Sequence, residues 1–203
     1  PDPTFEPYAP TWAQMDAAVQ AGRLLRNDWV WRVLLIMRCT GLRAGQVFRL
    51  QWRDIDLDAG LMHIRPELGK SRQERRGRIV PIAPVLLADL TTWPRLGERV
   101  IHRAPRTLDQ DAVVRAWELA GVPLEARRQP LHCMRRGFLS GLAAAGVSLE
   151  VRQILVGHSS GVTRDTYIPD RAFAETLRSA VALVPPLQTV EGITRRLGRR
   201  TTR

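Results

Sequence analysis

Apolar residues recur at helical spacing along most of this 203-residue chain and switch to alternation in one region, residues 61–82. There Met62 and Ile64 alternate with more polar neighbours, a polar glycine-containing stretch follows, and Ile79 begins a second apolar run. This pattern predicts an antiparallel hairpin with a long basic tip, and Pro81 confines its second strand to an edge or its own end. We therefore expect a mainly α-helical domain with one small antiparallel β-sheet (α+β).

Capping residues and glycines mark where the helices begin and end. Thr11 and Gln14 form a capping box at the first helix, Thr107 and Gln110 form a second one, and Ser148 caps a later helix. The expected helices span about 11–21, 28–38, 44–50, 84–90, 107–121, 131–145, 148–157 and 172–184. These elements predict one folded domain over residues 11–184, with a proline-rich linker at 1–10 and a basic tail at 185–203.

The charge of the chain favours a polyanion as its partner. Thirty-one basic residues against 20 acidic ones give a net charge of +11. No apolar run approaches the roughly 18 residues of a membrane span, and no signal peptide is recognisable. Cys39 and Cys133 cannot form a disulfide framework or a zinc cluster, and we expect them to be small buried hydrophobes. The composition predicts a cytoplasmic protein that does not engage membranes.

One lysine stands out among the basic residues. Lys70 is the only lysine of the chain, and every other basic position is arginine. Arginine hardly releases its proton, whereas lysine can act as a proton donor in catalysis. Lys70 is therefore a candidate general acid, although a lysine in a hairpin tip is by default a solvated turn residue.

A set of basic and phenolic residues completes a candidate phosphoryl-transfer site. His132 and Arg135 share one face of a predicted helix, and Arg43 lies in a glycine-assisted turn. His158 follows a helix end, and Tyr167 comes nine positions later. Arginine forks bind phosphate, and a phenol becomes a nucleophile when a neighbouring group helps to remove its proton. The set suits transfer of a DNA phosphoryl group to tyrosine without a metal.

These residues lie in motifs that resemble the catalytic domain of the tyrosine recombinases, the phage integrase family. The resemblance covers about residues 11–182, and its motifs occur in the family's order. They are TGLRAGQ at 40–46, LQWRDID at 50–56, Lys70, HCMRRGF at 132–138, LVGHSS at 155–160 and Tyr167. The chain departs from the family at Gln46, where Glu is usual, and at Cys133, where Asp is common.

The resemblance implies an enzyme that carries out site-specific DNA recombination or integration. Arg43 and Arg135 would hold the scissile phosphate, and His158 would donate a further hydrogen bond to it. Tyr167 would attack the phosphorus and form a 3′-phosphotyrosyl intermediate. No metal and no cofactor are implied.

Two further residues would manage protons in this reaction. Lys70 would protonate the leaving 5′ oxygen, and His132 would help with the proton of the nucleophile. Further basic side chains are expected to contact DNA, namely Arg72, Arg75, Arg76, Arg78 and Arg136.

The resemblance also implies an assembly. Four protomers would act on two double-stranded recombination sites and would be linked by their C-terminal segments, for which the helix from residue 172 and residues 181–187 are candidates. Full-length family members carry an N-terminal DNA-binding domain. We expect that domain to be absent here, so that the chain is a fragment or a minimal member. We expect a bacterial or phage protein that is associated with the nucleoid.

Three alternatives remain open from the sequence. A type IB topoisomerase uses a similar set of Arg, Lys, His and Tyr residues but relaxes DNA as a monomer. A silent DNA-binding module derived from a recombinase would have no need to keep all of these residues. A metal-dependent nuclease is disfavoured, because Asp54, Asp56 and Asp58 share one segment and have no distant acidic partner.

Overall fold

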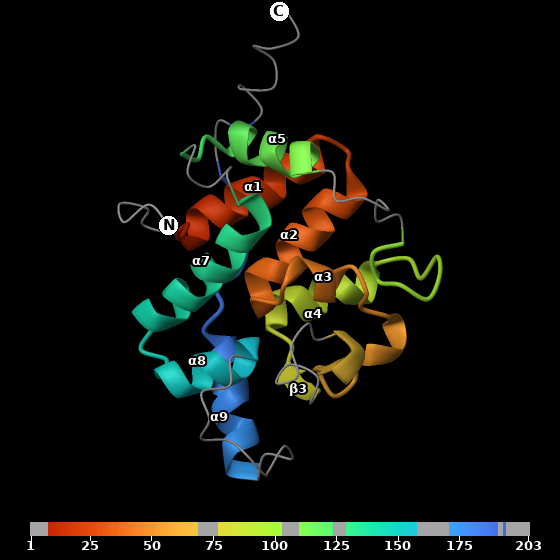
Figure 1. Ribbon diagram of the computed structural model, residues 1–203, viewed down its shortest axis with the longest axis vertical. Coiled ribbons are helices and arrows are strands. Elements are labelled where there is room, and N and C mark those ends of the chain that lie inside the picture. The colour runs from red at the N-terminus through yellow and green to blue at the C-terminus, as the bar shows by residue number, and fades with distance from the viewer. Residues whose placement is uncertain are drawn as a thin grey trace, which may run out of the picture.

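The computed structural model shows a mainly helical domain with one small sheet, as the sequence predicts (Figure 1). It describes residues 8–68, 77–102, 110–123, 129–157, 171–190 and 193. Its helices are α1 (Trp12–Leu24), α2 (Asp28–Thr40), α3 (Ala44–Val47), α4 (Pro84–Thr92), α5 (Gln110–Ala120), α7 (Pro130–Ala144), α8 (Leu149–Val156) and α9 (Arg171–Ala182). Two short 3₁₀ helices are η1 (Trp52–Asp54) and η2 (Pro66–Leu68).

The sheet is antiparallel, with the strand order β1 (Ile55–Asp56), β2 (Leu61–Ile64) and β3 (Arg78–Pro81). In β3, Arg78 faces Ile64 across the ladder and Pro81 faces Leu61. The predicted pairing of the two strands and the edge position of the second are confirmed, and Pro81 is the last residue of that strand; residues 69–76 of the predicted basic tip lie outside the described residues. The two-residue strand β1 was not predicted, because two residues are too few for a period-two pattern.

Helix starts follow the capping signals of the sequence. The backbone N–H of Gln14 donates to Thr11 Oγ1 at 3.3 Å, and the Thr11 N–H donates to Gln14 Oε1 at 2.9 Å, which completes the predicted capping box. At α8 the Val151 N–H donates to Ser148 Oγ at 3.3 Å. The box predicted at Thr107 lies outside the described residues.

The core forms around α2, which packs against α1, α5 and α7. Every residue of α2 from Val33 to Thr40 is buried, so this helix is central, as its apolar residues on several sides predict. Both cysteines are fully buried, and burial raises the pKa of the Cys39 and Cys133 thiols to about 12. The expectation that they are small core residues is confirmed. None of the helices within the described ranges is long and apolar enough to cross a membrane.

The lower part of the molecule in Figure 1 holds α8 and α9 together with the sheet. α9 packs against both α8 and β3, and α8 packs against α7. The chain therefore brings the end of the hairpin close to the helix that precedes residue 158.

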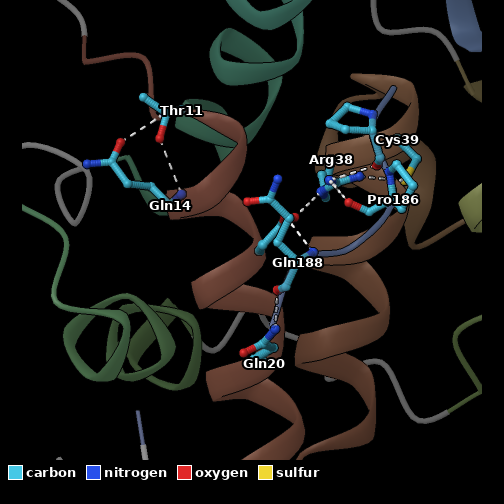
Figure 2. A network of polar contacts seen from close by, with 9 residues as sticks. Thr11, Gln14, Gln20, Arg38, Cys39, Pro186 and Gln188 are labelled. Carbon is cyan, nitrogen blue, oxygen red and sulfur yellow. Dashed lines mark hydrogen bonds and ion pairs between the residues drawn. The ribbon is translucent and has the colours of Figure 1, made fainter. Parts of the chain in front are cut away.

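After α9 the chain returns to α1 and α2 as an extended segment, residues 185–190, which we call the C-terminal strap (Figure 2). The buried Arg38 guanidinium pairs with Asp16 and also donates to the Pro185 carbonyl at 3.0 Å. Asp16 in turn accepts from the Gln188 N–H at 3.1 Å. The side chain of Gln20 makes two hydrogen bonds with the strap. Its Nε2 donates to the Gln188 carbonyl, and its Oε1 accepts from the Val190 N–H at 3.0 Å. The strap, which the sequence placed in the basic tail, is thus held on the chain's own first two helices.

Candidate active site

Arg135 joins three separate elements at the centre of the candidate site. Its side chain is 1% exposed, although arginine is rarely buried without partners. Nη1 donates to the Gly41 carbonyl at 2.6 Å, and Nη2 donates to the Val156 carbonyl at 2.9 Å. Arg135 on α7 therefore ties together the turn after α2 and the end of α8. These are the segments that carry Arg43 and lead to His158.

The turn before Arg43 requires a glycine. Gly41 ends α2 with a φ of +61°, in the left-handed region that side chains disfavour. A Cβ there would lie 2.5 Å from Phe138 Cδ1 and 2.9 Å from Val156 Cγ1. The glycine of the TGLR motif therefore lets α2 stop against α7 and α8.

Arg43 begins α3 as its N-cap residue and is half-buried. Its backbone N–H donates to the side-chain oxygen of Gln46 at 3.1 Å, and Gln46 is only 2% exposed. A glutamine oxygen can accept this bond as a glutamate oxygen would, so Gln46 supports the turn in place of the family's usual acid. At the other departure, Cys133 Sγ lies 3.1 Å from the Pro130 carbonyl within α7.

His132 lies one helical turn before Arg135 on α7 and reaches the surface. Partial burial lowers the pKa of His132, and the positive charges of Arg136, Arg135 and Arg43 lower it further. Three guanidinium groups thus act on one imidazole. Their positive charge favours an anion at this place and keeps the imidazole neutral at neutral pH.

This environment predicts a pH-dependent stability that His132 controls. Because the pKa of His132 is lowered from 6.5, the unfolded chain binds more protons near and below that pH, and the domain loses stability as the pH falls through this range. His132→Gln should remove that loss, which we expect to be no more than about 1 kcal/mol because the side chain reaches solvent. Urea unfolding of both proteins between pH 5 and pH 7.5 measures it. An unchanged pH slope in the variant would contradict the prediction.

Two of the arginines predicted to contact DNA are described, and both make contacts within the protein. Arg136 Nη1 donates to the Tyr8 carbonyl at 3.1 Å, and its Nη2 donates to the side chain of Gln129. Arg78 is 6% exposed and its Nε donates to the Leu155 carbonyl at 3.2 Å. Their contact with DNA stays a prediction.

The stretch leading to Lys70 is anchored by a residue that the sequence did not single out. Arg49 Nη1 and Nη2 donate to the carbonyls of Glu67 and Leu68, both at 2.8 Å, and its Nε donates to the Gly45 carbonyl at 2.9 Å. Arg49 therefore links α3 to η2, which ends two residues before Lys70. The signal that could have indicated this role is its place between two site motifs. Outside the described residues lie the predicted site residues Lys70, Arg72, Arg75, Arg76, His158 and Tyr167.

The chain thus forms a mainly helical domain in which the guanidinium groups of Arg43, Arg135 and Arg136 all act on the imidazole of His132. A sequence profile described as the phage integrase family matches residues 26–172, and the chain belongs to this family.

Named relatives agree with this assignment. The chain is 32% identical over 142 residues to the tyrosine recombinase XerC of Xanthomonas campestris pv. campestris, covering 66% of this chain and 42% of that protein. Among solved structures it resembles an integrase from mycobacterium phage Brujita, with a TM-score of 0.66 and 21% identity over 98% of this chain and 64% of the other. The XerA recombinase matches with a TM-score of 0.59 and 14% identity, over 100% of this chain and 66% of that one. The chain thus spans less than half of its XerC relative, and the two structures support the fold.

Proposed function

We propose that this chain is the catalytic domain of a site-specific tyrosine recombinase, which cuts and rejoins duplex DNA through a phosphotyrosyl intermediate. The observation that carries the proposal is the double hydrogen bond of Arg135, which draws the turn of Arg43 and the end of α8 together beside His132. The domain would comprise residues 11–184, with the C-terminal strap packed on it, and would act together with DNA-binding parts outside this chain.

The reaction follows from the chemistry of these side chains. Arg43 and Arg135 bind the oxygens of the scissile phosphate and stabilise the charge that develops on them, and His158 donates a further hydrogen bond. Tyr167 Oη attacks the phosphorus, so that an O–P bond forms to the phenol while the bond from phosphorus to the 5′ oxygen breaks.

Proton transfer accompanies both bond changes. The phenol proton of Tyr167 passes to His132, whose lowered pKa keeps the imidazole neutral and able to accept it. Lys70 gives a proton to the departing 5′ oxygen. Attack of a 5′ hydroxyl from a second strand on the phosphotyrosine reverses these steps and completes the exchange. Guanidinium charges supply the phosphate stabilisation, so the proposal invokes no metal and no cofactor.

The partner in this proposal is double-stranded DNA at recombination sites, in the bacterial cytoplasm where the nucleoid lies. The net charge of +11 supports it, and the arginines proposed to contact the DNA backbone are Arg72, Arg75, Arg76 and Arg136.

Four protomers would assemble on two sites and exchange their C-terminal segments. In the isolated chain the strap lies on its own α1 and α2, so exchange requires it to leave those helices first. Sedimentation of the DNA-bound protein measures the number of protomers, and a complex that remains monomeric on paired sites would contradict the assembly.

Covalent trapping tests the proposed reaction. Nicked suicide duplexes from the DNA beside the gene are incubated in EDTA with the parent, with Tyr167→Phe and with Tyr8→Phe, the matched control at the only other tyrosine. We expect an SDS-resistant protein–DNA band with the parent and with Tyr8→Phe, and none with Tyr167→Phe.

Three other results would contradict the proposal. A band that survives in Tyr167→Phe would exclude this nucleophile. A gel shift without any covalent band would favour a silent DNA-binding module or a need for an N-terminal DNA-binding domain, and repeating the assay with that domain supplied separates the two. Relaxation of supercoils by a monomer that never joins two sites would favour a type IB topoisomerase.

A further inference from the structure

We propose that Arg78 is a positioning residue of this site, which fixes the end of α8 and with it the point from which the chain continues to His158. The inference rests on the proposed function. It concerns a side chain that the sequence assigned to DNA contact and that the structure buries against another element.

Arg78 and Arg135 hold neighbouring carbonyls at the end of α8. Arg78 Nε donates to the Leu155 carbonyl at 3.2 Å, and Arg135 Nη2 donates to the Val156 carbonyl at 2.9 Å. The last carbonyls of a helix have no partner within the helix and carry partial negative charge, so cationic donors stabilise them. One of these donors comes from the sheet and the other from α7, so the helix end is held from two sides.

The next residue shows how closely Arg78 approaches. Gly157 caps α8 with a φ of +72°, and a Cβ there would lie 2.5 Å from Arg78 Nη1 and 2.8 Å from Arg78 Cζ. The guanidinium therefore occupies the space that any other side chain at position 157 would need. Because consecutive Cα atoms are about 3.8 Å apart, whatever fixes Gly157 also restricts where residue 158 begins.

Arg78 also connects two parts of the proposed reaction. It is the first residue of β3 and pairs with Ile64, the last residue of β2. It therefore lies at the end of the β2–β3 ladder, next to the segment that joins the two strands. The chain between η2 and β3 contains Lys70, the proposed general acid. A single side chain thus joins the base of the segment that contains Lys70 to the helix that leads to His158.

The chain offers a matched control on the same helix. Arg152 lies in the first half of α8 and likewise donates to backbone carbonyls, to Val147 at 3.0 Å and to Leu139 at 3.4 Å. Replacing it removes an arginine with similar backbone contacts, but these lie towards the other end of α8. A general weakening of α8 would affect both substitutions, whereas positioning of His158 would affect Arg78 alone.

The first test is a double-mutant cycle with single-turnover cleavage of a suicide duplex at saturating protein. Arg78→Met should slow cleavage about tenfold or more, with DNA affinity within about threefold of the parent. In a His158→Gln background the same substitution should cost less than about twofold, because the group it positions is already gone. Arg78→Lys should recover part of the rate, since an amine can reach one carbonyl. Arg152→Met should change the rate by less than about twofold in both backgrounds.

The second test does not depend on cleavage. The imidazole NMR signals of His158, assigned by their loss in His158→Gln, should shift in Arg78→Met and Arg78→Lys and stay in place in Arg152→Met. If Arg78→Met does not fold, both the cleavage rate and the His158 signals are measured with Arg78→Lys instead.

The outcomes separate this inference from the function on which it rests. Equal losses of rate in both backgrounds, or a loss of DNA affinity alone, would overturn the positioning role and favour a structural or DNA-contacting one. Unmoved His158 signals would overturn it as well. Absence of any covalent complex with the parent, accompanied by shifted His158 signals, would instead refute the proposed reaction and leave the positioning role intact.

Discussion

Arg38→Met is expected to lower the free energy of unfolding by about 3–5 kcal/mol, because it leaves the buried carboxylate of Asp16 without its cation. Neither side chain of this ion pair is exposed at all. The same guanidinium donates to the Pro185 and Pro186 carbonyls at 3.0 Å and 3.4 Å and lies 5.1 Å from the centre of the Trp12 ring. The substitution therefore removes an ion pair, the anchor of the C-terminal strap and a cation–π contact together.

The matched control is the ion pair between Arg23, which is exposed, and Asp89, which is partly exposed; Arg23 Nη2 and Asp89 Oδ1 are 3.1 Å apart. Arg23→Met should cost less than about 1 kcal/mol, since exposed ion pairs contribute little. Combining Arg38→Met with Asp16→Leu should recover part of the loss, because no charge then remains buried. Urea unfolding measures all four proteins, and equal costs for Arg38→Met and Arg23→Met would contradict the prediction.

The loss in Arg38→Met should also depend on pH. Burial raises the pKa of Asp16, and the charge and hydrogen bond of Arg38 oppose that rise. Because the pKa of Asp16 is raised even with Arg38 in place, the folded carboxyl of the variant holds its proton to a still higher pH, and the stability that the substitution removes grows as the pH rises. The variant should therefore be closest to the parent near and below a pH of about 4 and furthest from it at neutral pH.

Arg135→Lys is expected to slow formation of the covalent DNA complex about 100-fold to 1,000-fold or more. An ammonium group lacks the planar fork that reaches the Gly41 and Val156 carbonyls at once, and it would offer fewer donors to the phosphate proposed to bind here. The positive charge is kept, so a large effect would come from geometry. Single-turnover trapping with the suicide duplex measures the rate, and thermal unfolding measures the accompanying loss of stability.

Arg115→Lys on α5 serves as the control, because Arg115 is exposed and lies on a helix outside the site. It should leave the trapping rate within about twofold of the parent. If Arg135→Lys trapped DNA as fast as this control, Arg135 would not be part of the phosphate site.

Local sequence signals predicted most of the secondary structure. Thr11 and Ser148 cap their helices as their residue types suggest, and the alternation around Met62 with Pro81 gave the hairpin and its edge. These features depend on hydrogen bonds and side-chain periods within a few residues, which a single sequence displays directly.

The candidate site was predictable from the order of its motifs, and the structure brings three of its residues together. The charges of Arg43 and Arg135 both lower the pKa of His132, although these two arginines are 92 positions apart in the sequence. The roles of all six predicted catalytic residues stay predictions. The burial of Arg78 could not be foreseen, because it ends a run of arginines and its contact with Leu155 joins residues 77 positions apart.

The ion pair of Arg38 and Asp16 escaped prediction for a related reason. A polar residue in an amphipathic helix is by default exposed, and nothing near Asp16 in the sequence indicates burial. Its further partner, the Gln188 N–H, is 172 residues away. Only the strap across α1 and α2 makes this position an interior one.

The strap also limits the order in which contacts of the domain can form during translation. In a chain emerging from the ribosome, Asp16, Gln20 and Arg38 are synthesised more than 140 positions before Pro185 and Gln188. Contacts between such distant segments form late, after the loop between them has closed. The hydrogen bonds between the strap and helices α1 and α2 therefore cannot form until the residues after α9 have been synthesised. A nascent chain stalled in α9 would leave the ion pair of Asp16 and Arg38 without the hydrogen bonds that the strap supplies.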